Sequence, residues 1–158
     1  MKAIIETPVG YLEITTTLNG VSSIQFKDNI TEEYSPQNEI TKEAAKQLAA
    51  YVKGESQTFK MPLDLSGTEF QKRVWHELQK IPYGTTISYL ELARRLGDEK
   101  SIRAAASANG KNPIAIVVPC HRVIGSNGDL VGYAGGLNRK KWLLQHEGAL
   151  DQLELFSS

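Results

Sequence analysis

The sequence predicts an α+β fold, in which a small N-terminal sheet-plus-helix domain precedes a mainly helical domain with a helix-turn-helix and a loop holding a candidate active-site cysteine. Three observations favour this fold. Apolar and polar residues alternate on both sides of a hairpin signal, segment 38–53 has the period of an amphipathic helix, and glycines and prolines separate several helical segments in the second half. We expect domains at 1–65 and 66–150, followed by a tail at 151–158.

The N-terminal domain has β-strand patterns ahead of its helix. The expected strands span 2–6, 11–17 and 21–26. Asn19-Gly20 is a strong hairpin signal between the second and third strands. The helix over 38–53 has one apolar face and stops at Gly54. A polar stretch at 58–67 is typical of a linker, and nothing in this domain suggests chemistry.

The second domain is expected to be mainly helical. Its helices are predicted over 69–80, over 88–96, from a cap at Asp98 to about Gly110, and over 137–146. The two middle helices are joined by a tight turn at Gly97, which matches a helix-turn-helix, although the spacing alone favours an ordinary αα-hairpin. The apolar run 115–119 predicts a short buried strand that leads to Cys120, and a glycine-rich loop follows over 126–136.

Charge is distributed unevenly, although the net charge of the chain is +0. Residues 1–65 carry 6 Lys+Arg and 9 Asp+Glu, a net −3, whereas residues 66–150 carry 12 and 7, a net +5. The basic part points to a polyanionic partner, and an unevenly solvated surface is the alternative. No apolar run approaches the roughly 20 residues that span a bilayer, and the N-terminus lacks the apolar stretch of a signal peptide. We therefore expect a cytoplasmic protein without membrane contact.

A lone cysteine, Cys120, lies within Pro119-Cys120-His121-Arg122. One cysteine excludes an internal disulfide, and the three histidines lack zinc-ligand spacing, so no metal is expected. A lone cysteine is commonly a small buried apolar residue. Here an imidazole and a guanidinium adjoin it, and both favour a reactive thiolate if the chain turns at this point. Glu147 is a candidate carboxylate to orient His121.

Segment 112–148, with its PCHRV motif at 119–123, resembles the active-site signature of the O6-alkylguanine-DNA alkyltransferases. The resemblance continues through 70–93, which is similar to the family's first helix and the lead-in to its helix-turn-helix, and through the N-terminal strands. It covers nearly the whole chain. It implies a ribonuclease H-like N-terminal domain and repair of DNA by irreversible transfer of an alkyl group from O6-alkylguanine, with O4-alkylthymine as a further substrate.

The resemblance also implies roles at the reacting centre. Cys120 is the alkyl acceptor, His121 is its base through a water molecule, and Glu147 polarises His121. Asn112 ties the helix-turn-helix to the cysteine loop, and Tyr89 bonds the extruded base. The residues implied to line the substrate pocket are Val123, Tyr133, Ala134 and Gly135. The carbonyl groups of Cys120 and Val123 are expected to accept from the guanine amine.

For DNA binding, the resemblance implies a monomer on the minor groove of double-stranded DNA. Arg103 is the expected finger that replaces the extruded guanine in the stack. The other residues implied to contact DNA are Tyr89, Ser101, Ala104, Ala105, Asn109 and Arg122.

The thioether product has no good leaving group and no motif for a regenerating cofactor is visible, so each molecule repairs one lesion and no cofactor is expected.

Two features depart from the family pattern. One branch of the family holds zinc in its N-terminal domain, and a chain with one cysteine cannot build that site. Some members carry serine where this chain has Ala134, which changes the contacts open to the alkyl group. Two other functions remain for comparison. A Cys-His hydrolase shares the nucleophile and base but leaves Arg103 unexplained, and a non-catalytic DNA-binding regulator leaves the PCHR motif unexplained.

Overall fold

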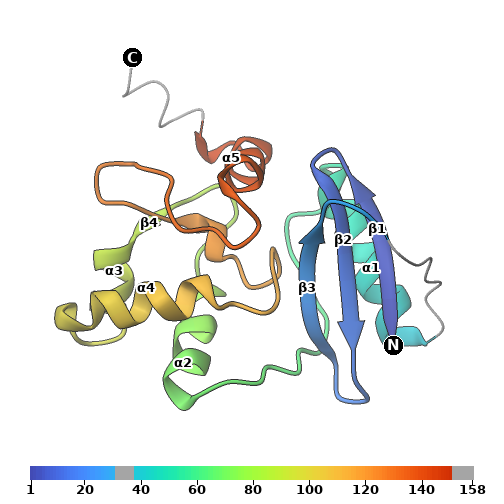
Figure 1. The fold of residues 1–158 in the computed structure, drawn as a ribbon, viewed down its shortest axis with the longest axis horizontal. Helices are drawn as coiled ribbons and strands as arrows, with labels where there is room; N and C mark the ends of the chain where they lie inside the picture. Colours follow the sequence, from blue (N-terminus) through green and yellow to red (C-terminus); the bar gives the residue numbers. More distant parts are fainter. Residues whose placement is uncertain (31–37, 151–158) are drawn as a thin grey trace. The chain divides into compact units, whose positions relative to one another are not determined.

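The computed structural model describes residues 1–30 and 38–150, so the predicted tail at 151–158 lies outside the described residues. Contacts divide the chain into two compact units. The first holds the described residues up to Ser66 together with Pro113–Val117, and the second holds Gly67–Asn112 and the described residues from Val118 onward. A sheet with a helix in the first unit and mainly helices in the second make this an α+β fold, as predicted (Figure 1).

The first unit is built on an antiparallel sheet with the strand order β1-β2-β3. Its strands are β1 (Lys2–Thr7), β2 (Gly10–Thr16) and β3 (Val21–Lys27), close to the predicted ranges. Ile14 lies opposite Ala3 on one side and Ile24 on the other, and all three are buried. The alternation in the sequence therefore reflects one covered face of the sheet. Gly20 is required in the β2–β3 turn because a Cβ there would lie 2.6 Å from the carbonyl oxygen of Pro62.

The helix α1 (Glu39–Val52) packs against β1 and β2. Asn38 caps it by accepting a hydrogen bond of 2.8 Å from the main-chain N–H of Thr41. Its buried residues recur at three- and four-residue intervals: Thr41, Ala44, Leu48 and Tyr51. Ala44, Leu48 and Tyr51 lie at positions that the apolar pattern of the sequence predicts, whereas Thr41 is buried although it is polar.

The predicted strand at 115–119 is wrong. Ala115 donates to the carbonyl of Ile24 (3.0 Å), but the chain then turns instead of continuing along β3. Val117 donates to Ala115 (2.8 Å) around Ile116, whose φ is 72°, which is the geometry of a γ-turn. A second i→i+2 bond of 2.8 Å, from Cys120 to Val118, closes around Pro119. The apolar β-branched residues of this run explain the expectation that it is buried. It does not form a strand, because Pro119 has no N–H for a strand ladder and the two turns change the direction of the chain before Cys120.

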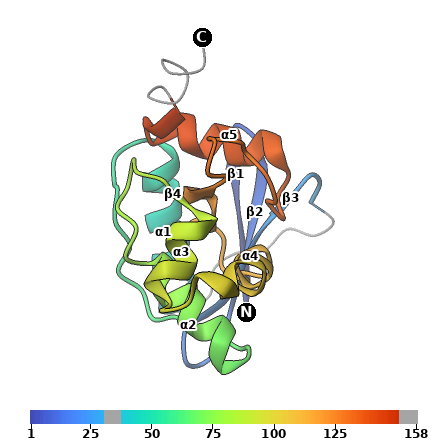
Figure 2. The same ribbon diagram turned by 90° about the vertical axis from the view of Figure 1, so that its left-hand side faces the viewer.

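The second unit is mainly helical. Its helical segments are α2 (Glu69–Leu78), α3 (Tyr89–Arg95), the 3₁₀ turn η1 (Glu99–Ser101), α4 (Ile102–Gly110), the 3₁₀ turn η2 (Cys120–Arg122) and α5 (Leu137–His146). A capping box between Thr68 and Gln71 starts α2. Asp98 caps η1, as predicted, by accepting from the N–H of Lys100 (2.9 Å). The helices α3 and α4 pack together, and α2 packs against both (Figure 2).

A short parallel pair of strands, which the sequence does not predict, links two distant segments of this unit. Ile87 of β4 (Ile87–Ser88) pairs with Val123 of β5 (Val123–Ile124). The pair holds the residues after the cysteine turn beside the start of α3. Across residues 1–30 and 38–150, no helix has the length and apolar character needed to cross a bilayer.

Candidate active site

Cys120 begins the 3₁₀ turn η2, and this turn decides where the neighbouring side chains lie. In a strand, adjacent residues would point to opposite faces, whereas the turn buries Cys120, His121 and Arg122 together at 7%, 0% and 6% exposure. The main-chain N–H of Arg122 donates to the carbonyl of Pro119 (3.0 Å), which closes the turn. The irregular backbone expected at Pro119 is thus present.

The thiol of Cys120 is held in its neutral form. Burial raises the pKa of the Cys120 thiol, and a hydrogen bond from Asn112 and the positive charge of Lys140 only partly oppose this. Asn112, two residues after α4, also donates from Nδ2 to the carbonyl oxygen of Val118 (2.7 Å). This bond links the residue that follows α4 to the segment that leads to Cys120. A neutral thiol is a weak nucleophile, so this site needs a base.

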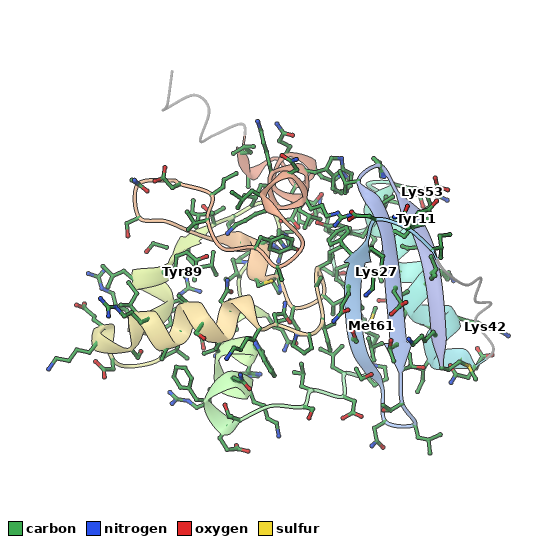
Figure 3. The ribbon with its side chains drawn as sticks, viewed as in Figure 1. Tyr11, Lys27, Lys42, Lys53, Met61 and Tyr89 are labelled. Atoms are coloured by element: carbon green, nitrogen blue, oxygen red, sulfur yellow. The ribbon has the colours of Figure 1, made fainter. Side chains whose placement is uncertain are left out.

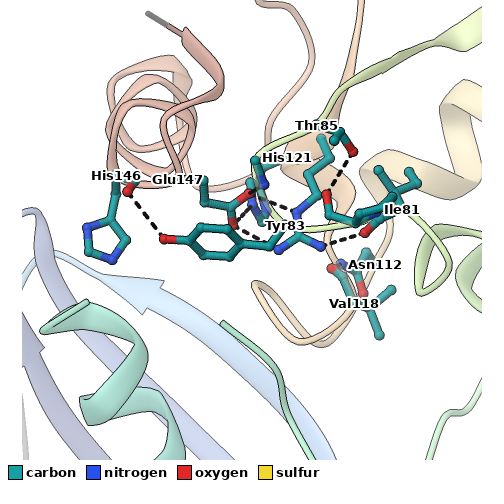
Figure 4. Close-up of polar contacts among 11 residues, drawn as sticks. Ile81, Tyr83, Thr85, Asn112, Val118, His121, His146 and Glu147 are labelled. Atoms are coloured by element: carbon teal, nitrogen blue, oxygen red, sulfur yellow. Dashed lines mark hydrogen bonds and ion pairs between the residues drawn. The ribbon is translucent and has the colours of Figure 1, made fainter. Parts of the chain in front are cut away.

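His121 and Glu147 form a buried pair at the centre of the site. His121 Nε2 lies 2.8 Å from Glu147 Oε2, and both side chains are fully buried (Figure 4). Within the described part of the chain, the other ring nitrogen, Nδ1, is buried and has no hydrogen-bond partner. Burial lowers the pKa of His121, Glu147 opposes this, and Arg122 and Lys140 add to the lowering. The imidazole is consequently neutral and able to accept a proton.

The Glu147 carboxylate is the most heavily bonded group in the site. Arg122 donates to both of its oxygens, from Nε to Oε1 (2.8 Å) and from Nη2 to Oε2 (2.9 Å). The N–H of Gly84 adds a contact of 3.3 Å to Oε1. Burial by itself would raise the pKa of Glu147, but the bonds and charges of His121 and Arg122 lower it far below its usual value.

The expectation that Arg122 contacts DNA is corrected. Its guanidinium is buried, donates to Glu147 and reaches the carbonyl oxygen of Ile81 from Nη1 (2.7 Å). It also lies 5.8 Å from the ring centroid of Tyr83, whose hydroxyl donates to the carbonyl oxygen of His146 (Figure 4). Because these contacts join segments far apart in the sequence, the roles of Ile81, Tyr83 and Gly84 have no local sequence signal.

Two tyrosines flank the thiol. Tyr89 begins α3 (Figure 3), and its hydroxyl donates to the carbonyl oxygen of Val131 (3.0 Å). Burial, followed by the charge of Cys120, raises the pKa of Tyr89 and also that of Tyr133, which lies well above its usual value. The Tyr133 hydroxyl oxygen is buried and has no partner among the residues that the structure describes. Both hydroxyls therefore stay protonated; that of Tyr133 can donate to a bound molecule, whereas that of Tyr89 must first release the Val131 carbonyl.

Lys140 is a site residue that the sequence reasoning missed. Its Nζ donates to the carbonyl oxygens of Val123 (2.7 Å) and Val131 (2.8 Å) and lies 5.8 Å from the Tyr89 ring centroid. Burial lowers the pKa of Lys140 to about 8. The signal was present, because Lys140 lies three and four residues before the buried Leu143 and Leu144 and so shares their face of α5.

The residues expected to contact DNA divide by exposure. Arg103 and Ala104 on α4 are exposed and Ser101 is half-buried. Ala105 and Asn109 are buried at 0% and 1% exposure, which corrects their assignment as DNA contacts. Asn109 instead donates from Nδ2 to the carbonyl oxygen of Cys120 (3.4 Å). An open cavity of about 450 Å³ lies beside α4 and is lined by Tyr89, Ile102, Arg103, Ala106, Ser107, Gly110, Val131 and Gly132.

The residues expected to line the substrate pocket differ in exposure. Val123 is fully buried, Ala134 is exposed and Gly135 is half-buried, its carbonyl accepting from Arg139 Nη1 (3.3 Å). The expected acceptors for a guanine amine already have donors: the Cys120 carbonyl accepts from Asn109 Nδ2 and from the main-chain N–H of Val123, and the Val123 carbonyl accepts from Lys140 Nζ. Since a carbonyl oxygen has two lone pairs, a guanine amine would have to replace one of the two donors on the Cys120 oxygen.

Two family models cover the chain. Residues 1–65 match the 6-O-methylguanine DNA methyltransferase ribonuclease-like domain, and residues 69–149 match the DNA binding domain of the same family. A methylated-DNA–protein-cysteine methyltransferase of Methanosarcina acetivorans is 45% identical over 152 residues, covering 93% of this chain and 97% of the relative. One from Mycobacterium leprae is 46% identical over 158 residues, covering 96% of each.

Solved structures agree with these matches. The O6-methylguanine methyltransferase of Mycobacterium tuberculosis superposes with a TM-score of 0.82 at 41% identity, covering 99% of this chain and 98% of that one. The Mycobacterium tuberculosis OGT in complex with DNA gives a TM-score of 0.84 at 43% identity, with 94% and 92% covered. The resemblance of the cysteine segment is confirmed: this chain belongs to the 6-O-methylguanine DNA methyltransferase family.

Proposed function

We propose that this protein repairs DNA by transferring the alkyl group of O6-alkylguanine to Sγ of Cys120, in a reaction that each molecule performs once. The observation that carries the proposal is the buried chain of groups from Cys120 through His121 to Glu147, in a turn where a neutral imidazole adjoins a neutral thiol. The relatives are methylated-DNA–protein-cysteine methyltransferases, and one similar structure contains DNA. O4-alkylthymine is proposed as a second substrate of the same site.

The reaction proceeds by displacement at the alkyl carbon. His121 accepts the thiol proton through a water molecule at Nδ1, while Glu147 holds the opposite ring nitrogen. The Sγ–carbon bond forms as the carbon–O6 bond breaks, and the electron pair of that bond leaves with the guanine. Tyr133 or Tyr89 passes its hydroxyl proton to the ring of the departing base, so that guanine leaves in neutral form, and the proton that His121 took from Cys120 restores the hydroxyl. The thioether that results is stable, so Cys120 is not regenerated.

The lesion must leave the base stack to reach Cys120, because O6 of guanine lies among stacked bases. Arg103 is exposed on α4 and borders the same cavity as Tyr89, so it fills the place that the flipped nucleotide vacates. Ser101 and Ala104 lie near it in sequence and are accessible to the backbone of DNA. We assign this face to the minor groove of duplex DNA and the helices α3 and α4 to a helix-turn-helix, with the protein acting as a cytoplasmic monomer.

Residues 1–65 and 66–150 are proposed as separate domains, of which the second carries the reaction. The residues of the reacting centre all come from segment 81–147, which lies within the basic region 66–150. Asn112 and Asn109 are proposed to hold the segment 118–120 against α4 through the carbonyls of Val118 and Cys120. Val123, Tyr133, Ala134 and Gly135 are proposed to surround the flipped base.

Intact-mass spectrometry tests the proposal. The protein is mixed with a duplex that holds a single O6-methylguanine, and with a matched duplex that holds guanine. We expect a mass gain of one methyl group, mapped to Cys120 by peptide analysis and saturating at one per protein molecule. Cys120→Ser is the control and gains none. Tight binding to the lesion without a mass change would indicate the non-catalytic regulator, and turnover of an ester substrate would indicate the Cys-His hydrolase.

A further inference from the structure

Glu147 lies between two nitrogen-bearing side chains, one of which carries a permanent charge. His121 takes one contact to the carboxylate, and Arg122 takes a contact to each of its oxygens. We propose that Arg122 is a positioning residue that keeps His121 in its neutral, proton-accepting form by cancelling the charge of Glu147. The inference rests on the proposed function, in which His121 must start the reaction without a proton.

The need for a cancelling charge follows from the His121–Glu147 contact itself. A carboxylate 2.8 Å from an imidazole nitrogen stabilises the imidazolium form, and an opposite charge at this range raises a pKa by about 1–3 units. A histidine protonated at neutral pH cannot take the proton of Cys120. Glu147 therefore has to orient the ring without charging it, which requires a second cation on the carboxylate.

An arginine is suited to this task because a guanidinium is a positively charged group with planar, paired N–H donors. The guanidinium of Arg122 meets both carboxylate oxygens at 2.8 and 2.9 Å, the two-point geometry that a lysine cannot reproduce. Its third contact, to the carbonyl of Ile81 at 2.7 Å, and the Tyr83 ring fix the plane of the group. Burial of the whole cluster excludes the solvent that would otherwise screen these charges.

The other charged group that acts on His121 is Lys140, whose charge also disfavours the imidazolium. Burial lowers the pKa of Lys140 to about 8, so the contribution of Lys140 fades in mildly alkaline solution. Below neutral pH Lys140 and Arg122 are both charged, and only Arg122 bonds to Glu147 directly. The effect of Arg122 is thus seen most clearly on the acid side of the rate profile.

The test compares Arg122→Gln, which keeps hydrogen-bond donors but removes the charge, with Arg122→Lys, which restores the charge. The His121 ring is followed by NMR in histidine-labelled protein and assigned with His121→Gln. The rate of methyl transfer from an O6-methylguanine duplex is measured across pH. We expect Arg122→Gln to raise the pKa of His121 by about one unit or more. The acid limb of the rate profile should move with it, giving a loss of about tenfold on that limb and a smaller loss above pH 8.

Arg122→Lys should return both the His121 pKa and the acid limb toward the parent values. An equal loss of rate at every pH, with an unchanged His121 pKa, would show that Arg122 only supports the fold and would overturn the inference. If Arg122→Gln does not fold, the double variant Arg122→Gln/Glu147→Gln removes both charges and leaves no unpaired ion. Its His121 pKa should match that of the parent, and a fall of about one unit or more contradicts cancellation.

These readouts separate the inference from the proposed function. The NMR titration needs no alkyl transfer, so it tests cancellation even in a protein that accepts no alkyl group. The mass measurement on the unmodified chain tests transfer to Cys120 whatever the His121 pKa is. A chain that fails the mass test but passes the titration retains the electrostatic arrangement without the reaction.

Discussion

Lys140 Nζ donates a hydrogen bond of 2.8 Å to the carbonyl oxygen of Val131, the same oxygen that accepts from the hydroxyl of Tyr89 at 3.0 Å. One carbonyl thereby joins α5, the loop that follows the cysteine turn, and the start of α3. Lys140 also reaches Val123, so a single buried ammonium group holds both ends of the segment 123–131. The loop that borders the cavity beside α4 depends on this lysine.

Removing the charge of Lys140 should slow alkylation of Cys120. Lys140→Met takes away a positive charge that lowers the pKa of the thiol, so we expect that pKa to rise by about one unit and the thiolate fraction at neutral pH to fall about tenfold. The pH dependence of iodoacetamide modification, followed by intact mass, measures the shift. Lys141→Met, at an exposed position on the same helix, is the matched control. Identical profiles for the two variants would contradict this role.

Acid should destabilise the second unit through Glu147. The folded-state pKa of Glu147 lies far below the unfolded value of about 4.5, so its stabilisation is complete above that pH and is lost progressively as the pH falls below it. Glu147→Gln should lower the free energy of unfolding at neutral pH by about 3–5 kcal/mol, because Arg122 is left buried without its partner. It should also flatten the dependence of stability on pH below about 4.5.

Chemical denaturation at a series of pH values measures this effect. Glu69→Gln is the matched control, since the Glu69 side chain is 94% exposed and its ion pair with Lys72 is long, at 3.9 Å. We expect the control to keep the acid dependence of the parent protein. A Glu147→Gln variant with that same dependence would mean that other carboxylates govern acid unfolding.

Arg103→Ala should separate repair in DNA from reaction with a free base. Arg103 is exposed on α4, and its side chain makes no hydrogen bond or ion pair with residues 1–30 or 38–150. The substitution therefore leaves the site around Cys120 intact. We expect methyl transfer from an O6-methylguanine duplex to slow much more than reaction with free O6-benzylguanine, measured as rate constants by intact mass. Lys72→Ala on α2 serves as a basic-residue control. Equal losses on both substrates would reject the finger role.

Trp75 should be needed for the position of α4. Its indole Nε1 donates to the carbonyl oxygen of Ala108 (2.9 Å), and its side chain is 2% exposed. Trp75→Phe removes this donor and leaves the Ala108 carbonyl with the main-chain N–H of Lys111 alone (3.2 Å), and we expect a loss of about 0.5–1.5 kcal/mol in the free energy of unfolding. Trp142→Phe, at a half-buried tryptophan stacked on His146, should cost less in the same denaturation assay. Equal costs would contradict a specific role for the indole bond.

The sequence by itself was enough to predict the elements whose cause is local. The strand over 11–17 and the helix over 137–146 were predicted because a period of two or of 3.6 residues records which face is buried. The Pro119-Cys120-His121-Arg122 motif likewise brings a thiol, a base and a cation together by covalent adjacency. Family membership followed from these same residues, and the comparisons confirmed it.

Tertiary structure alone decided what each of those side chains faces. The run 115–119 has the composition of a strand, but it bonds to β3 at one end only and turns at Ile116. Arg122 is of a residue type that commonly contacts DNA, but here Glu147, 25 residues further along the chain, binds it in the interior. Lysine is a residue type that usually lies at the surface, but the Lys140 ammonium group is held near the thiol by the carbonyls of Val123 and Val131. Periodicity reports burial, whereas the partner of a buried charge is set by contacts between segments that no local pattern encodes.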